Sequence, residues 1–129
     1  MDDLVFSTAG VVWREERETF SFALDKWDVQ AAKRMIARTP RMTASLSMTH
    51  DLAALLAFIV TDAAHAATAD LSVPLIYAHY PDTDTGMLID GWHRVRRAFT
   101  EKRAALPCVM LTAEESVTCM AKRRRRASR

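Results

Sequence analysis

Three basic side chains crowd the start of a predicted helix, in the stretch MLIDGWHRVRRAFTEKR at residues 87–103. His93, Arg94 and Arg97 fall in the first turns, where the helix macrodipole disfavours cations and favours anions. An anion above the first turn would explain them, because guanidinium groups bind phosphate in a bidentate way and imidazole exchanges protons near neutral pH. The pattern predicts phosphate recognition and identifies no general base.

The residues before these cations predict the turn that would position a phosphate. The apolar residues at 87–89 are typical of the end of a buried strand, and Asp90 is a good N-cap. Gly91 has no side chain to keep a ligand from the first backbone N–H groups. Trp92 favours a core position over a base-stacking platform. The alternative is a purely structural turn, in which Arg94 pairs with an acid such as Asp90 and His93 fills the cap region.

A hairpin is predicted to lead into this turn. PLIYAHY at residues 74–80 has strand-like alternation, and PDTDTG joins it to the strand that ends at Asp90. Asp82 and Asp84 could bind a divalent ion beside a phosphate, but the same residues are typical of an ordinary turn, which we favour. His79 and Tyr80 are interpreted as packing residues.

The remaining elements predict an α+β fold, a small mixed sheet of hairpins with packed helices. Capping and periodicity indicate the helices, and apolar or alternating runs indicate the strands. His50 and His65 are too far apart on one long helix to share a metal, and no metal site is predicted. Helices are expected at 28–39, with Asp28 as N-cap, at 49–66, after Asp90, and after Thr112, which forms a capping box with Glu115. Strands are expected at 10–13 and 19–24, and these two are expected to pair as a hairpin joined by REERE. A further strand is expected at 105–111, where Pro107 fits only at the start of the strand or on an edge strand.

Length and composition favour one domain. The chain has 129 residues, half of them apolar, which is enough for a single hydrophobic core. Cys108 and Cys119 have neither metal-ligand spacing nor the density of a disulfide scaffold, so we expect reduced thiols. The acidic N-terminus lacks the character of an export signal, and LAALLAFIV falls well short of a membrane span of roughly 20 residues. A cytoplasmic protein without a membrane partner is expected.

The positive charge gathers at the C-terminus. Of 18 Lys and Arg residues, six lie in residues 119–129, which leaves 12 basic against 16 acidic residues in the rest. We therefore expect a domain at 1–118 followed by a basic tail at 119–129. Such a tail either contacts nucleic acid or only adds solubility, and the sequence does not decide between these. The predicted contact residues are Lys122, Arg123, Arg124, Arg125 and Arg126.

The segment IDGWHRVRRA, with the later LPCVML strand, resembles the nucleotide-binding signature of the ParB/sulfiredoxin superfamily. The resemblance covers about residues 71–115. It implies a small α+β domain in which a Gly-(Cys or acid)-(His or Arg)-Arg turn holds the phosphates of ATP or CTP at a helix N-terminus. The implied binding residues are Asp90, Gly91, Trp92, His93, Arg94 and Arg97, with Mg²⁺ accompanying the nucleoside triphosphate.

Two departures from the family narrow this prediction. Sulfiredoxins carry a catalytic cysteine where this chain has Trp92, so sulfinic acid reduction is not expected. Chromosome-segregation ParB proteins continue into DNA-binding and dimerisation domains, which we do not expect in 129 residues. The chain then resembles the stand-alone ParB-like proteins of bacteria and their plasmids, some of which are nucleases or NTPases.

Two functions follow from the sequence. One is binding of a nucleotide or a nucleic-acid phosphate, DNA included, with nuclease or NTPase activity left open. The other is a non-catalytic module that keeps the fold and binds or inhibits a protein partner. The sequence leaves a homodimer open in both cases.

Overall fold

The computed structural model describes residues 4–6, 11–13, 19–22, 25–81 and 83–121, and its elements confirm the α+β class. The helices are α1 (Val29–Arg38), α2 (His50–Leu56), α3 (Ala63–Ala67), α4 (Trp92–Thr100) and α5 (Ala113–Cys119). The strands are β1 (Leu4–Phe6), β2 (Val11–Trp13), β3 (Thr19–Phe22), β4 (Asp25–Asp28), β5 (Ala44–Ser47), β6 (Leu75–His79), β7 (Gly86–Asp90), β8 (Ala105–Met110) and β9 (Met120–Ala121).

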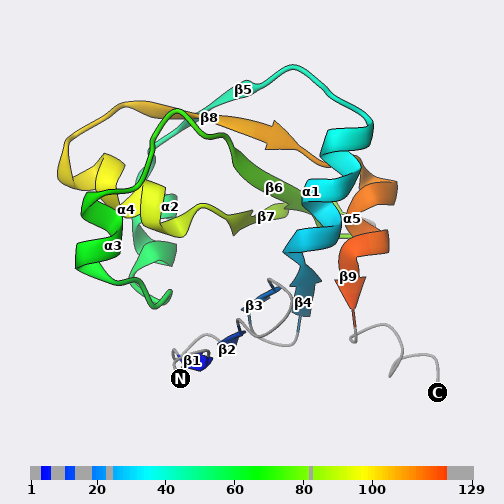
Figure 1. Cartoon of the computed structure of the whole chain (residues 1–129), viewed down its shortest axis with the longest axis horizontal. Helices are drawn as coiled ribbons and strands as arrows, with labels where there is room; N and C mark the ends of the chain where they lie inside the picture. The colour runs from blue at the N-terminus through cyan, green and yellow to red at the C-terminus, as the bar shows by residue number, and fades with distance from the viewer. Residues whose placement is uncertain (1–3, 7–10, 14–18, 23–24, 82, 122–129) are drawn as a thin grey trace.

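A four-stranded mixed sheet with the order β5-β8-β6-β7 forms the centre of the fold. β8 pairs antiparallel with β5 and parallel with β6, and β6 pairs antiparallel with β7, which confirms the predicted hairpin. Helices α2, α3 and α4 gather at one end of this sheet, while α1, α5 and the β4–β9 pair lie at the other (Figure 1). The predicted site therefore lies at the α2–α4 end.

The core is built from the strand runs and helix faces that the sequence makes apolar. All six aliphatic or Met residues at 75–78 and 87–89 have almost no exposed surface, as do the inward positions of α4. Cys108 is buried, as expected of a small core residue. The helix faces contribute residues spaced three and four apart, the pattern that packs one stripe of a helix on a sheet. The core members nearest the site are Leu75, Ile76, Leu88, Ile89, Trp92, Val95 and Ala98.

Local capping signals place two helices correctly. Asp28 caps α1 by accepting a hydrogen bond from the Ala31 N–H at 3.0 Å, and the helix ends at Thr39, directly before Pro40. Thr112 and Glu115 form the predicted capping box at the start of α5. These motifs are local, so the sequence alone is enough to find them.

The single helix expected at 49–66 is wrong, because the chain forms two short helices there, α2 and α3. Asp62 caps the second helix by accepting from the Ala64 N–H. The backbone between the helices bonds to α4 instead of continuing a helical ladder: Thr61 accepts from Arg96, and the Asp62 N–H donates to His93. Hydrogen bonds to α4 therefore replace the bonds that would continue one helix between α2 and α3. Phe58, which lies in this connection, is exposed.

The strands expected at 10–13 and 19–24 are present as β2 and β3 and lie close together, but no β2–β3 ladder is found among the described residues. β2 pairs with β1, and β3 pairs with β4, a strand the sequence analysis missed. β4 carries Trp27, which is fully buried and packs between the rings of Phe20 and Tyr80. The connection at 14–18, Gly10 and residues 23–24 lie outside the described residues. Burial of the Trp27 ring thus accounts for the pairing of β3 with β4.

Pro107 lies third in β8, inside the sheet rather than at its start or edge. The Met48 N–H donates to the Ala104 carbonyl, so hydrogen-bonded pairs in the β5–β8 ladder recur every second residue from that pair. Pro107 is opposite Ser45 and falls at a non-hydrogen-bonded position. Its missing N–H therefore costs this ladder nothing.

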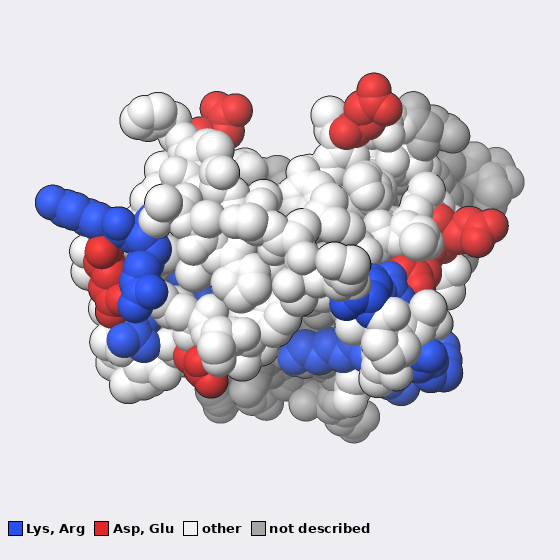
Figure 2. Space-filling view, turned by 90° about the horizontal axis from the view of Figure 1, so that it is seen from above, with Lys and Arg blue, Asp and Glu red and all other residues white. Residues whose placement is uncertain are grey.

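The folded part continues past residue 118, where the basic tail was expected to begin. Cys119 and Met120 belong to the hydrophobic core, and β9 pairs with β4. None of the helices in the described residues is both long and apolar enough to cross a bilayer. Seen from above, the molecule carries charged side chains at its ends and rim around a mostly uncharged middle (Figure 2).

Arg41 and Glu115 tie the segment after α1 to α5. The Arg41 guanidinium donates to both carboxylate oxygens of Glu115, at 2.5 and 3.0 Å, and also reaches the backbone carbonyl of Thr39. The hydrogen bond from Arg41 holds the pKa of Glu115 below its usual range, against the opposing effect of burial. Glu115 also completes the capping box, so one carboxylate serves both contacts.

We predict that Glu115→Ala lowers the free energy of unfolding by about 1–2 kcal/mol, because it removes a helix cap and a bidentate ion pair together. Urea unfolding followed by circular dichroism measures this change. The matched variant is Glu114→Ala, which removes an exposed carboxylate from the same helix turn and should change stability by less than about 0.5 kcal/mol.

The Glu115 contribution should also depend on pH. Because the pKa is lowered in the folded state, the stabilisation is present above the ordinary glutamate pKa and is lost as the pH falls through the folded-state value. The difference between wild type and Glu115→Ala should therefore shrink in acid. An unchanged difference at low pH would show that the ion pair contributes nothing.

Candidate functional site

The turn between β7 and α4 begins at a glycine rather than at the predicted aspartate cap. Gly91 is the N-cap of α4, with φ of 109°, and no side chain caps the helix. Asp90 is instead the last residue of β7, paired opposite Ile76, and its carboxylate accepts from Arg94 Nη2 at 3.0 Å. The expectation that Asp90 caps α4 is therefore wrong, because Arg94 takes the carboxylate.

Only glycine fits at residue 91. Its φ lies in the left-handed region, and an added Cβ would lie 2.3 Å from Leu75 Cδ2 and 3.3 Å from Arg94 Cζ. The chain therefore passes tightly beneath Leu75 and the guanidinium at the start of α4. Without a capping side chain, the first-turn N–H groups keep their capacity to bind an acceptor.

Arg94 anchors the turn to the segment that precedes β6. Its Nη1 donates to the carbonyls of Val73 and Pro74 at 2.6 and 2.7 Å, and its Nη2 donates to Asp90. These contacts account for three of the five N–H groups of a guanidinium. Arg94 is thus a structural residue that retains two donors, the Nε–H and one Nη2–H.

His93 faces α3 and acts as an acceptor. Its Nε2 accepts from the Asp62 N–H at 3.1 Å, and its ring stacks on His65 with centroids 4.2 Å apart. Burial lowers the pKa of His93, and the neighbouring His65 lowers it further, while Asp62 opposes the shift. The ring is therefore neutral at neutral pH, with its proton assigned to Nδ1 by the hydrogen bond at Nε2.

The other two arginines of α4 also bind backbone carbonyls. Arg97 donates to the Ala69 carbonyl and to the carboxylate of Glu101, both at 2.6 Å. Arg96 donates to the carbonyl and hydroxyl of Thr61. Internal acceptors thus explain why cations crowd this helix, and a bound anion is not needed to account for them.

Trp92 takes the core position that the sequence favoured. Its side chain is 5% exposed, and its Nε1–H donates to the Leu88 carbonyl at 2.9 Å. It cannot stack on a base in this arrangement. Trp92 can contribute only its backbone N–H to a ligand at the turn.

The structure separates the predicted binding residues into three places along α4. Asp90, Gly91 and Arg94 lie together at the turn, His93 is directed toward α3, and Arg97 lies one turn further on. Asp62 and His65, the partners of His93, were missed by sequence reasoning. They belong to the segment assigned to one continuous helix, which would have carried them away from α4.

A cavity of about 450 Å³ lies beside Arg97. Arg97 and Arg103 supply its positive charge, and Asp70 and the nearby Glu101, which bonds both arginines, offset it. Asp70 accepts hydrogen bonds from Ser72, which lower the pKa of that carboxyl. The cavity is thus close to neutral and offers no strong attraction for a polyphosphate.

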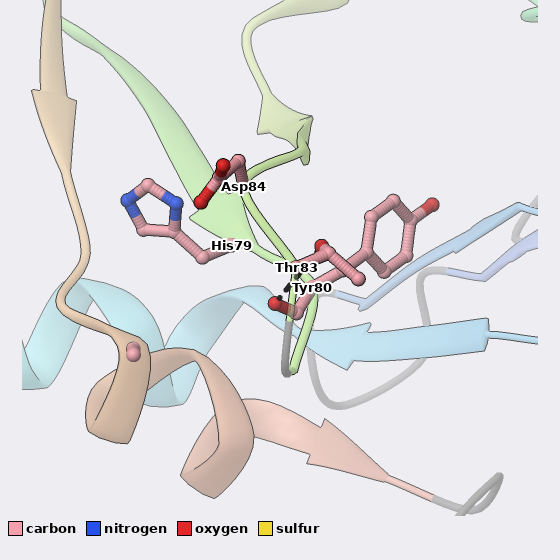
Figure 3. Close-up of a pocket in the computed structure, with 5 residues that line it drawn as sticks. His79, Tyr80, Thr83 and Asp84 are labelled. Carbon is pink, nitrogen blue, oxygen red and sulfur yellow. Dashed lines mark hydrogen bonds between the residues drawn. The ribbon is translucent and has the colours of Figure 1, made fainter.

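A second cavity, of about 510 Å³, lies at the far end of the β6–β7 hairpin. Figure 3 shows the Asp84 carboxylate directed toward the His79 imidazole, while the Tyr80 ring points away from this pair. Tyr80 also packs on Trp27, which supports its interpretation as a packing residue. Nothing among the described residues that line the cavity indicates a substrate.

Asp84 cannot serve a phosphate at Gly91. The five residues of β7 lie between them, a separation of roughly 15 Å at about 3.3 Å per residue. In the described residues no group of three or more His, Cys, Asp or Glu could hold a metal ion. Asp82 lies outside the described residues, as do the tail positions predicted to contact nucleic acid, Lys122, Arg123, Arg124, Arg125 and Arg126.

Comparisons with known proteins identify no relative. No protein-family model, no curated protein and no solved structure matches the chain. The resemblance to the ParB/sulfiredoxin superfamily therefore stays a prediction that depends on the motif residues alone.

We predict that Arg94→Met lowers the free energy of unfolding by about 2 kcal/mol, since three hydrogen bonds from a charged and largely buried group are lost. Chemical denaturation measures it. Arg103→Met removes an arginine that is 54% exposed and bonded to Glu101, and should cost less than about 0.5 kcal/mol. Equal stabilities of wild type and Arg94→Met would mean that Arg94 does not anchor the turn.

Proposed function

We propose that this protein binds a phosphate group of a nucleoside triphosphate or a nucleic acid at the turn formed by Asp90, Gly91 and Arg94. One observation carries the proposal: α4 begins at a glycine with no capping side chain, directly beside a guanidinium with two uncommitted N–H groups. A helix N-terminus supplies backbone donors and a favourable dipole for an anion, and arginine supplies planar donors.

Asp90 limits how strongly the turn attracts an anion. Its carboxylate lies 3.0 Å from Arg94 Nη2 and competes with a phosphate for the same guanidinium. A polyphosphate accompanied by Mg²⁺ carries less net negative charge, and is the form that we expect to bind. Among the described residues, the carboxylate at the turn is that of Asp90, which is bonded to Arg94, so we expect the metal to come with the nucleotide.

We propose that the turn binds the phosphate group without hydrolysing it. The nearest titratable side chain after Arg94 and Asp90 is His93, and its Nε2 is already bonded to the Asp62 N–H. A general base needs a free lone pair within reach of the nucleophile. Neither nuclease nor NTPase chemistry has an identified base among the described residues at the turn.

We predict that Asp90→Asn raises the affinity for ATP or CTP with Mg²⁺ roughly threefold to tenfold. The change removes a negative charge beside the guanidinium and keeps an oxygen acceptor for Arg94. Isothermal titration calorimetry of wild type and variant with both nucleotides measures it. Arg94→Lys keeps the charge, loses the planar fork and should weaken binding.

The matched control is Glu114→Gln, the same loss of one negative charge on α5, which should leave nucleotide affinity unchanged. If wild type and Asp90→Asn both fail to bind ATP and CTP at millimolar concentration, the proposed phosphate site is wrong. Thermal melts of each variant ensure that lost binding is not lost folding.

The basic tail gives the proposal a second, independent test with duplex DNA. The truncated variant ends at Ala121, because β9 pairs with β4 up to that residue. If the tail binds phosphates, removing residues 122–129 should reduce the slope of log K against log[salt] by about 3 to 5, since each phosphate contact contributes about 0.9. Fluorescence anisotropy across a salt series measures this. An unchanged slope would exclude a tail contribution.

A protein-interaction module is the second candidate function. The observation that favours it is that each arginine of α4 is bonded to a carbonyl, a carboxylate or a hydroxyl of the protein itself. Such a helix needs no ligand. The nucleotide titration above separates the two candidates.

A further inference from the structure

β5 is an edge strand, and its outer side is unpaired within the described residues. The sheet order places it at one end, with β8 as its single neighbour. Figure 1 shows β5 along the top of the molecule, with no helix drawn over it. An unpaired edge presents a row of backbone N–H and C=O groups that can pair with another strand.

The register identifies which groups point outward. Met48 donates to Ala104, so Leu46 and Ala44, two and four residues away, form the hydrogen-bonded pairs with β8. The N–H and C=O groups of the alternate residues, Ser45 and Ser47, therefore face away from the sheet. Both serine residues are exposed.

The β5 edge lacks the features that usually prevent an edge strand from pairing with another chain. Proteins blunt free edges with charged residues, prolines, bulges or covering elements. Residues 42–49 contain no Lys, Arg, Asp, Glu or Pro, and the β5–β8 register is regular. The adjoining Arg41 is held against Glu115, while Met42 is 90% exposed. The middle of the face seen from above is correspondingly uncharged (Figure 2).

We propose that β5 pairs antiparallel with β5 of a second copy of this chain, which joins the two four-stranded sheets into one. Two-fold pairing centred on Leu46 places Ser45 opposite the second copy's Ser47, so the outward groups of both strands meet in hydrogen-bonded pairs. In this register Leu46 faces its own copy and the residues on either side face one another within the same short run, so a charge in the run would lie close to the same charge of the second copy. The charge-free run at 42–49 meets this condition.

The contact is small, since the strand has four residues. A dimer held mainly by one strand pair belongs to the weak end of protein interfaces, and we expect a dissociation constant on the order of 10 µM or weaker. The test is sedimentation velocity of the full chain without nucleotide, from about 10 µM to 1 mM. The wild type should shift from monomer to dimer over this range.

Ser45→Pro is the sharpest variant, because it removes an outward N–H and leaves the ladder to β8 intact. It should sediment as a monomer throughout. Ser45→Lys with Ser47→Lys is a second route, which places four positive charges at the contact and should also give a monomer. Ala67→Lys, on exposed α3, is the control and should dimerise like the wild type. Circular dichroism checks the fold of each variant.

A wild type that stays monomeric at 1 mM would overturn the proposal. A dimer that survives both sets of substitutions would overturn it too, since another surface would then hold it. If Ser45→Pro fails to fold, the double lysine variant decides alone. The result is independent of the phosphate site, because no nucleotide is present and Asp90 and Arg94 are unchanged.

Discussion

The hydrogen bonds from α4 to the segment at 61–74 are the interaction on which the site depends. This segment contains one short helix and otherwise irregular chain, so its backbone carbonyls need donors from elsewhere. Arg94, Arg96 and Arg97 supply them, and His93 accepts a hydrogen bond from the Asp62 N–H of the same segment. The helix that carries the predicted phosphate motif is therefore also the clamp that fixes the chain around it.

Because α4 also fixes the segment at 61–74, its arginines are less available to a ligand than the sequence motif suggests. A guanidinium already fixed by Val73, Pro74 and Asp90 pays little conformational entropy when it meets a ligand, which favours binding. The same contacts remove part of its donor capacity and place a carboxylate beside it. The motif therefore combines preorganisation with weak electrostatic attraction, and the balance depends on Asp90 more than on the number of cations in the helix.

The sequence predicts those features whose signals are local. The Asp28 cap, the Thr112–Glu115 box and the β6–β7 hairpin each depend on neighbouring residues and are present. The break between α2 and α3 is different, since it depends on bonds from α4, about 30 residues away. The pairing of β3 with β4 follows from burial of Trp27, which no periodicity in that short segment indicates. At the turn, the cap was assigned to Asp90, whereas the structure has the Arg94–Asp90 ion pair that the sequence offered as the structural alternative.

β8 lies between β5, whose edge is proposed to pair, and β6, which follows the segment that Arg94 anchors. Its first residues, Ala105 to Pro107, line the cavity beside Arg97 on one side and pair with Ser47 to Ser45 on the other. A strand in the middle of a sheet has its backbone groups paired on both sides, so it moves little when either neighbour gains a contact. Dimerisation through β5 would therefore leave the turn at Gly91 in the same geometry. It would double the number of proposed phosphate sites in the assembly, and two weak sites joined rigidly would bind a long nucleic acid more tightly than one, provided the nucleic acid can reach both.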